Sequence, residues 1–137
     1  MESSRHWTLG AKLARPGVRV VHIEGDGGFH FSTPTSVYAV AQAYGLPILT
    51  VVLDNGGWQA VKEAVLRVHP DGPAAQANQF QARLLGDQRR FEQVAQAFGA
   101  HGEQVTHPDQ LEPAIVRCLQ ALDAGQAAVL VVRLAPI

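Results

Sequence analysis

The chain has 137 residues, 47% of them hydrophobic and 17% charged, which predicts one globular domain with an apolar core. Eleven basic against twelve acidic residues give a net charge of −1, so the sequence offers neither a basic surface for nucleic acid nor a polybasic patch for a membrane. The single cysteine, Cys118, excludes an internal disulfide and fits the cytoplasm, and no apolar run approaches the roughly 18 residues that cross a bilayer.

The first part of the chain alternates helical and strand patterns. Residues 9–14 have the pattern of the end of a helix, and no strand pattern comes before them. Residues 18–23 form a short β-branched run that predicts a strand. Apolar residues at helical spacing over residues 37–44 then predict a helix with Thr33 as its N-cap. Residues 48–53 are almost continuously apolar, which is typical of a strand covered on both faces.

The middle of the chain contains two more helical patterns around an irregular segment. Helical spacing of apolar residues recurs over residues 61–68 and again over residues 91–98. Residues 69–90 between them carry Pro, Gly, Gln and Ala with little periodicity. A stretch of this length is typical of a mobile loop, either a functional lid or a disordered segment, and a solvated, partly helical connection is an equal alternative.

The last part of the chain continues the alternation. Residues 100–105 predict a short strand, and residues 128–134 predict a buried one. Between them a helix is predicted over residues 111–122, and Thr106 and Asp109 before it have the spacing of a capping box. Alternating strands and helices imply parallel pairing, so we expect a three-layer α/β/α fold with a mainly parallel sheet, incomplete at the N-terminus.

Two predicted strands end in glycine-rich turns that contain oxygen ligands. The first continues into Gly25-Asp26-Gly27-Gly28-Phe29, and the second into Asp54-Asn55-Gly56-Gly57-Trp58. One helix joins the strands, so we expect them to be neighbours. Because ligands bind beyond the carboxyl ends of parallel strands, Asp26 and Asn55 should face the same small volume. A carboxylate and an amide oxygen are hard ligands that suit Mg²⁺ or Ca²⁺.

The glycines beside these ligands favour a phosphorylated partner. They remove side chains where a diphosphate would touch the backbone, and they expose N–H donors to it. Taken separately, both segments are also ordinary turn sequences, and that alternative stays open. A dinucleotide fingerprint does not fit, because His30 stands where a small residue is needed, and the sequence contains no Gly-Lys-Ser/Thr loop. The residues therefore predict a divalent metal together with a phosphorylated ligand.

Gly25-Asp26-Gly27, followed 29 residues after Asp26 by Asn55, resembles the thiamine diphosphate motif of the acetolactate synthase, pyruvate decarboxylase and benzoylformate decarboxylase superfamily. The likeness extends to residues 10–16, 43–48, 91–99 and 130–133, so it covers nearly the whole chain. By this resemblance, residues 1–137 are a single C-terminal thiamine diphosphate-binding domain or a fragment of one.

The resemblance implies how the metal and the cofactor are held. Asp26 and Asn55 would bind Mg²⁺ through their side chains, and Gly57 through its carbonyl. The other cofactor-binding positions are Gly25, Gly27, Gly28 and Trp58. Of these, Gly27 and Gly28 would lie against the diphosphate, whereas Trp58 either walls the site or caps the next helix. Asp54 and Gly28 depart from the family's pattern, because many members have Asn at the first position and Ser or Ala at the second.

The resemblance also implies how such a domain works. The cofactor supplies the chemistry, which is decarboxylation or ligation of a small 2-oxo acid, and the protein anchors and bends the cofactor. In the family, an activating glutamate lies on a separate pyrimidine-binding domain of the same or a partner subunit, and this chain has no counterpart of that domain. We therefore expect no catalytic residue in this chain, no turnover by it alone, and a role as part of a longer homo-oligomeric enzyme.

Other candidate residues have simpler interpretations. We expect His22 to be packed within its strand and Cys118 to lie in the core. His30 follows the motif closely enough to approach a substrate, although a surface turn is the simpler interpretation. Two rival functions stay open: a non-catalytic regulatory module that keeps the fold, and a Mg²⁺-dependent phosphoryl-transfer domain that uses the same strand ends.

Overall fold

The computed structural model describes residues 4–81, 83 and 89–136. Within these residues one sheet has the strand order β1-β2-β4-β3. The strands are β1 (Val21–Gly25), β2 (Leu49–Asp54), β3 (His101–Val105) and β4 (Ala128–Arg133). Each pairing is parallel. The predicted parallel sheet is therefore confirmed, including the short third strand and the neighbouring positions of β1 and β2.

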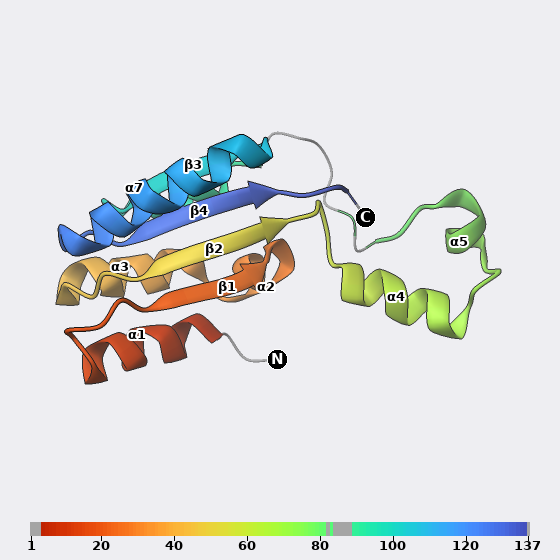
Figure 1. Ribbon diagram of the computed structural model, residues 1–137. Coiled ribbons are helices and arrows are strands. Elements are labelled where there is room, and N and C mark those ends of the chain that lie inside the picture. The colour runs from red at the N-terminus through yellow and green to blue at the C-terminus, as the bar shows by residue number, and fades with distance from the viewer. Residues whose placement is uncertain (1–3, 82, 84–88, 137) are drawn as a thin grey trace.

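Helices cover both faces of the sheet (Figure 1). On one face lies α7 (Leu111–Asp123). On the other face α2 (Asp26–Phe31), α3 (Pro34–Tyr44) and α6 (Phe91–Gln96) pack, with α1 (Ser4–Ala14) against α3. This arrangement confirms the three-layer α/β/α fold. None of the helices within the described ranges has the length and apolar character that a membrane span requires.

Two further helices extend away from the sheet. Beyond the carboxyl ends of the strands lie α4 (Gln59–Val68) and α5 (Pro73–Ala77), as Figure 1 shows, and neither contains a buried residue. Sequence periodicity predicted α4 well, but its apolar stripe is largely exposed: Val61 is 49% and Val68 69% accessible. The predicted loop over residues 69–90 is partly helical at α5, and its residues 82 and 84–88 lie outside the described ones.

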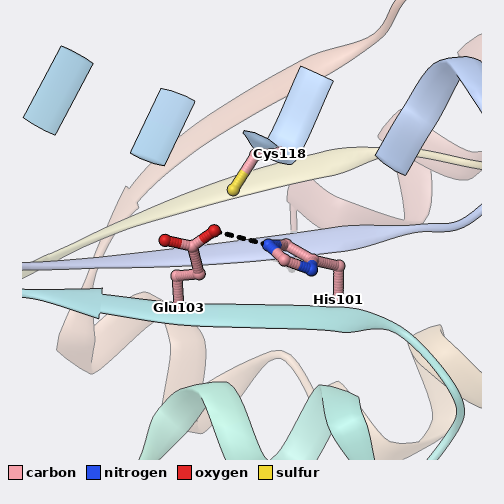
Figure 2. Close-up of side chains that lie close together, drawn as sticks. All are labelled: His101, Glu103 and Cys118. Atoms are coloured by element: carbon pink, nitrogen blue, oxygen red, sulfur yellow. Dashed lines mark hydrogen bonds and ion pairs between the residues drawn. The ribbon is translucent and has the colours of Figure 1, made fainter. Parts of the chain in front are cut away.

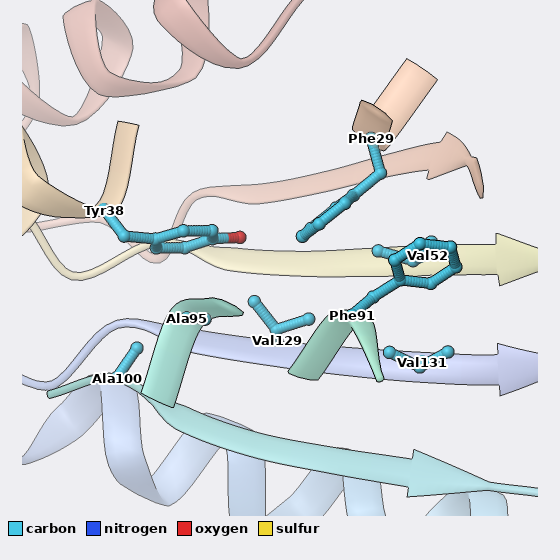
Figure 3. Packing of buried hydrophobic residues seen from close by; sticks show 8 residues of the cluster. All are labelled: Phe29, Tyr38, Val52, Phe91, Ala95, Ala100, Val129 and Val131. Atoms are coloured by element: carbon cyan, nitrogen blue, oxygen red, sulfur yellow. The ribbon is translucent and has the colours of Figure 1, made fainter. Parts of the chain in front are cut away.

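The aromatic cluster in Figure 3 fixes the segment that follows β1. Phe29 of α2, Tyr38 of α3 and Phe91 of α6 are all buried against β2 and β4. The rings of Phe29 and Phe91 lie 5.3 Å apart between centroids. Full burial of a side chain of this size contributes about 1.5–3 kcal/mol. The segment Gly25-Asp26-Gly27, predicted as a turn, is the end of β1 and the start of α2, and it is held by β1 before it and by Phe29 after it.

Two predicted boundaries differ from the structure at the first strand and helix. Pairing with β2 starts at Val21 and continues to Gly25, so the strand begins and ends later than the predicted residues 18–23. The following long helix begins where predicted, after Thr33, yet that residue has a φ of 47° and its side chain makes no capping hydrogen bond. Thr33 is thus an N-cap by position only.

The predicted capping box before α7 is wrong by one residue. The structure forms it between His107 and Gln110 rather than between Thr106 and Asp109. The Gln110 side-chain oxygen accepts the backbone N–H groups of Thr106, at 3.0 Å, and His107, at 3.2 Å. The reason is a short 3-10 turn, η1 (Pro108–Gln110), that precedes α7 and moves the first cap along the chain.

Candidate metal and diphosphate site at the ends of two strands

Asp26 is a buried carboxylate at the junction of β1 and α2, with only 2% of the residue accessible. Its Oδ1 accepts the N–H of Gly27 at 2.7 Å. Its Oδ2 accepts the N–H of Gly57 at 2.8 Å, from the segment after β2. The carboxylate therefore connects the ends of the two neighbouring strands.

Asn55 lies beside this carboxylate. Its Oδ1 accepts the same N–H of Gly57 at 3.3 Å, and its Nδ2 donates to Gln59 at 3.3 Å. Gly57 is also paired through an isolated antiparallel bridge with Arg83. The structure thus brings the side-chain oxygens of Asp26 and Asn55 within hydrogen-bond distance of one backbone N–H group, at the place where the sequence predicts a metal.

The electrostatics of Asp26 fit a cation site. Burial raises the pKa of Asp26 above its ordinary value, the N–H of Gly27 opposes this rise, and the neighbouring Asp54 adds to it. A divalent cation on this carboxylate would stabilise its charged form. The available donors are a carboxylate, an amide oxygen and backbone carbonyls, which are the ligands that Mg²⁺ takes. The residues present therefore fit the metal that the motif implies.

The predicted glycines differ in their surroundings. Gly25 ends β1 and immediately precedes α2. Gly27 is buried under the indole of Trp58, and a Cβ on Gly27 would overlap the Cδ1 and Nε1 atoms of that ring. Gly28 is exposed, and a Cβ there would come 3.0 Å from Oε2 of Glu24. Only a residue without a side chain fits at Gly27, as close approach of a ligand to its backbone would also require.

The structure places Trp58 at the start of a helix and its side chain beside Gly27. Its backbone is the N-cap of α4, with no capping side-chain bond, and its indole borders Gly27. The ring lies 5.3 Å from that of Phe31 between centroids. Its Nε1 is buried and has no hydrogen-bond partner among the residues that the structure describes. Trp58 is thus a helix-start residue whose side chain faces the candidate site.

Sequence reasoning missed a buried ion-pair network beneath the site. The side chain of Asp54 has no accessible surface, and its carboxylate pairs with Arg89 Nε at 3.1 Å and Arg133 Nη1 at 2.8 Å. Arg133 also donates to the carbonyl of Arg89 at 3.0 Å. One signal was available, because Asp54 and Arg133 both follow apolar strand runs and stand opposite each other where β2 pairs with β4.

The histidines near the site stay close to their simpler interpretations. His30 is exposed, with its ring edge on Phe91 at 5.1 Å between centroids. His22 is half-buried on β1, and its Nε2 lies 3.5 Å from a carboxylate oxygen of Glu24. His30 therefore has an aromatic contact at the surface beside the candidate site, and His22 is packed within its strand as predicted.

A second group of potential metal ligands lies far from this site, between β3 and α7 (Figure 2). Ligand atoms of His101, Glu103 and Cys118 lie within 4.8 Å of one another. Arg117 already donates to both oxygens of Glu103, at 2.8 and 2.6 Å, and His101 lies 2.6 Å from one of them. Burial raises the pKa of the Cys118 thiol to about 11. The group is thus an ion-pair cluster beside a protonated core cysteine.

The comparison with protein families gives a match over residues 1–132 to "thiamine pyrophosphate enzyme, C-terminal TPP binding domain". The acetolactate synthase large subunit IlvG of Mycobacterium tuberculosis is 32% identical over 111 residues, which cover 81% of this chain and 18% of that protein. The 2-hydroxyacyl-CoA lyase 1 of Mus musculus is 32% identical over 124 residues, covering 82% of this chain and 19% of that protein. The chain thus spans about a fifth of the length of these relatives.

Two solved structures share the fold. The thiamine diphosphate-dependent 4-hydroxybenzoylformate decarboxylase of Rhodococcus jostii superimposes with a TM-score of 0.75 at 22% identity, covering 95% of this chain and 22% of that one. The benzoylformate decarboxylase of Polynucleobacter necessarius gives 0.71 at 23% identity, covering 98% of this chain and 24% of that one.

Proposed function

We propose that this chain binds the diphosphate of thiamine diphosphate together with Mg²⁺. The chain belongs to the family of C-terminal TPP-binding domains of thiamine pyrophosphate enzymes. The observation that carries the proposal is the position of Asp26 and Asn55. They lie at the carboxyl ends of neighbouring parallel strands, and their side-chain oxygens approach the same N–H of Gly57 at 2.8 and 3.3 Å. Parallel sheets bind their ligands at this edge.

The proposal gives each predicted residue a task. Asp26 and Asn55 would hold Mg²⁺ through side-chain oxygens, and Gly57 through its carbonyl. The backbone of Gly27 and of Gly28 would lie against the diphosphate, because neither residue has a side chain to keep the ligand away. At the edges of the site, Gly25 would provide the turn out of β1 and Trp58 a border. When bound, the cofactor supplies the chemistry by stabilising a carbanion.

The same proposal places the chain in a larger enzyme. We infer that residues 1–137 act as one domain of an acetolactate synthase-like or 2-oxo acid decarboxylase-like enzyme, in the cytoplasm. A pyrimidine-binding domain of the same or a partner subunit would complete the site in a homo-oligomer, and a small 2-oxo acid would be the substrate. The names of the relatives, a synthase and a lyase, support this reaction class. By itself the chain is expected to be inactive.

The test is a calorimetric titration of the full-length protein with thiamine diphosphate in the presence and absence of Mg²⁺. We expect Asp26→Ala to abolish Mg²⁺-dependent binding, because the charged ligand is lost, and Asn55→Ala to weaken it strongly. The matched control is Asp109→Ala, since the Asp109 side chain is 89% exposed and follows β3, which β4 separates from β2 in the sheet. Circular dichroism and a cooperative unfolding transition show that each variant is folded.

Three other outcomes would contradict the proposal, and two of them indicate a different function. Unchanged binding by Asp26→Ala removes the central residue of the proposal. Binding of Mg²⁺ with a nucleotide, and not with thiamine diphosphate, indicates a phosphoryl-transfer domain instead. Binding of neither ligand by the folded wild-type protein indicates a regulatory module that keeps only the fold.

A further inference from the structure

The indole of Trp58 fills the space on the Cβ side of Gly27, a residue that we propose to lie against the diphosphate. A phosphate that packs on the Cβ side of Gly27 requires open space where a Cβ would stand. In this structure the Cδ1 and Nε1 atoms of the indole fill that space. The ring and a diphosphate therefore cannot both occupy the Cβ side of Gly27.

The indole of Trp58 packs on an exposed ring and leaves its own N–H without a partner among the described residues. Its ring packs on Phe31 at 5.3 Å between centroids, with the planes inclined by 37°. Phe31 is itself 76% exposed, so this contact lies at the surface. The buried Nε1 has no hydrogen-bond partner among the described residues, and a buried donor without an acceptor is unfavourable. Rotation of the ring into solvent would give this N–H a partner.

The backbone allows the ring to move without disturbing the sheet. On one side of Trp58, the N–H of Gly57 is bonded to Asp26 and fixed to the end of β1. On the other side begins α4, which has no buried residue. A segment with so little buried surface opens at low free-energy cost. Trp58 therefore lies at the boundary between a fixed strand end and a helix that is weakly attached.

We propose that Trp58 covers Gly27 in the ligand-free protein and turns away when the diphosphate binds. This inference rests on the proposed function of the same site. The covered state competes with the ligand, so the measured affinity equals the intrinsic affinity reduced by the fraction of molecules in which Gly27 is open. Removal of the indole should therefore speed association and tighten binding, whereas removal of a supporting wall would weaken it.

The experiment follows binding of Mg²⁺ with thiamine diphosphate to the full-length protein by stopped-flow fluorescence. The wild type and Trp58→Phe are measured side by side, so that their difference isolates the emission of Trp58. We expect this emission to shift to longer wavelength on binding, because the indole passes from a buried to a solvated position. Trp7→Phe is the matched control, since Trp7 lies in α1 and is 78% exposed.

Two further variants test the competition itself. Trp58→Ala should associate about three- to tenfold faster than the wild type and bind more tightly, because Gly27 is open in every molecule. Phe31→Ala keeps Trp58 as the reporter and removes the ring on which it packs. This variant should shift the emission of the ligand-free protein to longer wavelength and also speed association. Because Phe31 is exposed, we expect the variant to fold normally.

The possible results separate this inference from the proposed function. If the wild type binds and Trp58→Ala binds equally fast or more weakly, the indole is a wall and the inference is wrong, while the proposed function stands. A shift of Trp58 emission to shorter wavelength on binding contradicts the inference in the same way. If the folded wild type does not bind Mg²⁺ with thiamine diphosphate at all, the proposed function fails and the inference fails with it.

Discussion

The sheet and α4 have equally clear sequence patterns but reach opposite degrees of burial. In β4 the first four residues are fully buried, between α7 on one face and α6 on the other. In α4, whose apolar residues also recur at helical spacing, no residue is buried. Periodicity thus predicts which residues share a face of an element, but a second element must be present to cover that face.

The candidate site lies on the boundary between these two regions. Asp26, Asn55 and Gly57 are tied to the ends of β1 and β2 by hydrogen bonds between them. Trp58 begins the weakly attached region and still reaches back over the site. If both proposals hold, the ligands at the fixed strand ends would orient a charged group, and the movable indole of Trp58 would admit it.

We expect the largest effect on stability at Asp54, because its buried carboxylate pairs with Arg89 and Arg133 and so fixes the end of β2 to the sheet, which we call the rigid region. Asp54→Asn would leave the guanidinium groups of Arg89 and Arg133, each only 15% exposed, without their buried counter-charge. Breaking such a pair from one side lowers the free energy of unfolding by about 3–5 kcal/mol. Urea denaturation of both proteins at pH 7 measures this loss in the free energy of unfolding.

The matched control is Asp123→Asn. The carboxylate of Asp123 also pairs with an arginine, Arg19, but both side chains are more than half exposed, so the loss of stability should be much smaller than at Asp54. If the two substitutions cost the same, the network around Asp54 is solvated in solution and the boundary of the rigid region lies further into β2.

A second pair of substitutions compares the two regions directly. Leu130 is fully buried in β4, and Leu130→Ala should lower the free energy of unfolding by about 2–5 kcal/mol through lost burial and a cavity. Val68 in α4 is 69% exposed, so Val68→Ala should change the free energy of unfolding by no more than about 0.5 kcal/mol. Both values come from urea denaturation. A loss of several kcal/mol at Val68 would mean that another element covers α4 in solution.

The sequence predicted the layers of the fold because buried strands and amphipathic helices carry strong local patterns. It also placed Asp26 and Asn55 together, since the ends of neighbouring parallel strands meet at one edge of the sheet. The partners of Asp54 were not predicted. Arg89 and Arg133 lie far along the chain, and local patterns do not show which charges will pair across such separations. The exposure of α4 was not predicted either, because no local pattern reveals whether another element covers a helix.

The smallest effect is expected at the far edge of the rigid region, where Glu103 of β3 pairs with Arg117 of α7. The hydrogen bonds from Arg117 and then from His101 hold the pKa of Glu103 below its ordinary value, against the opposing effect of burial. A carboxyl group with a lowered native pKa stabilises the fold above its unfolded-state pKa, and this contribution is lost as the pH falls through the native pKa. Because Arg117 is 51% exposed, the pair should contribute much less to stability than the buried pairs of Asp54.

We therefore expect Glu103→Gln to lower the free energy of unfolding slightly at pH 7, and the difference from wild type to shrink as the solution is acidified. Urea denaturation of both proteins between neutral and strongly acidic pH measures this. Glu112→Gln, an exposed position in the first turn of α7, serves as the control and should show no such convergence. A wild-type advantage that stays constant or grows on acidification would mean that packing, and not the charge of Glu103, joins β3 to α7. In that case the edge of the sheet would be held by the same apolar contacts as its centre.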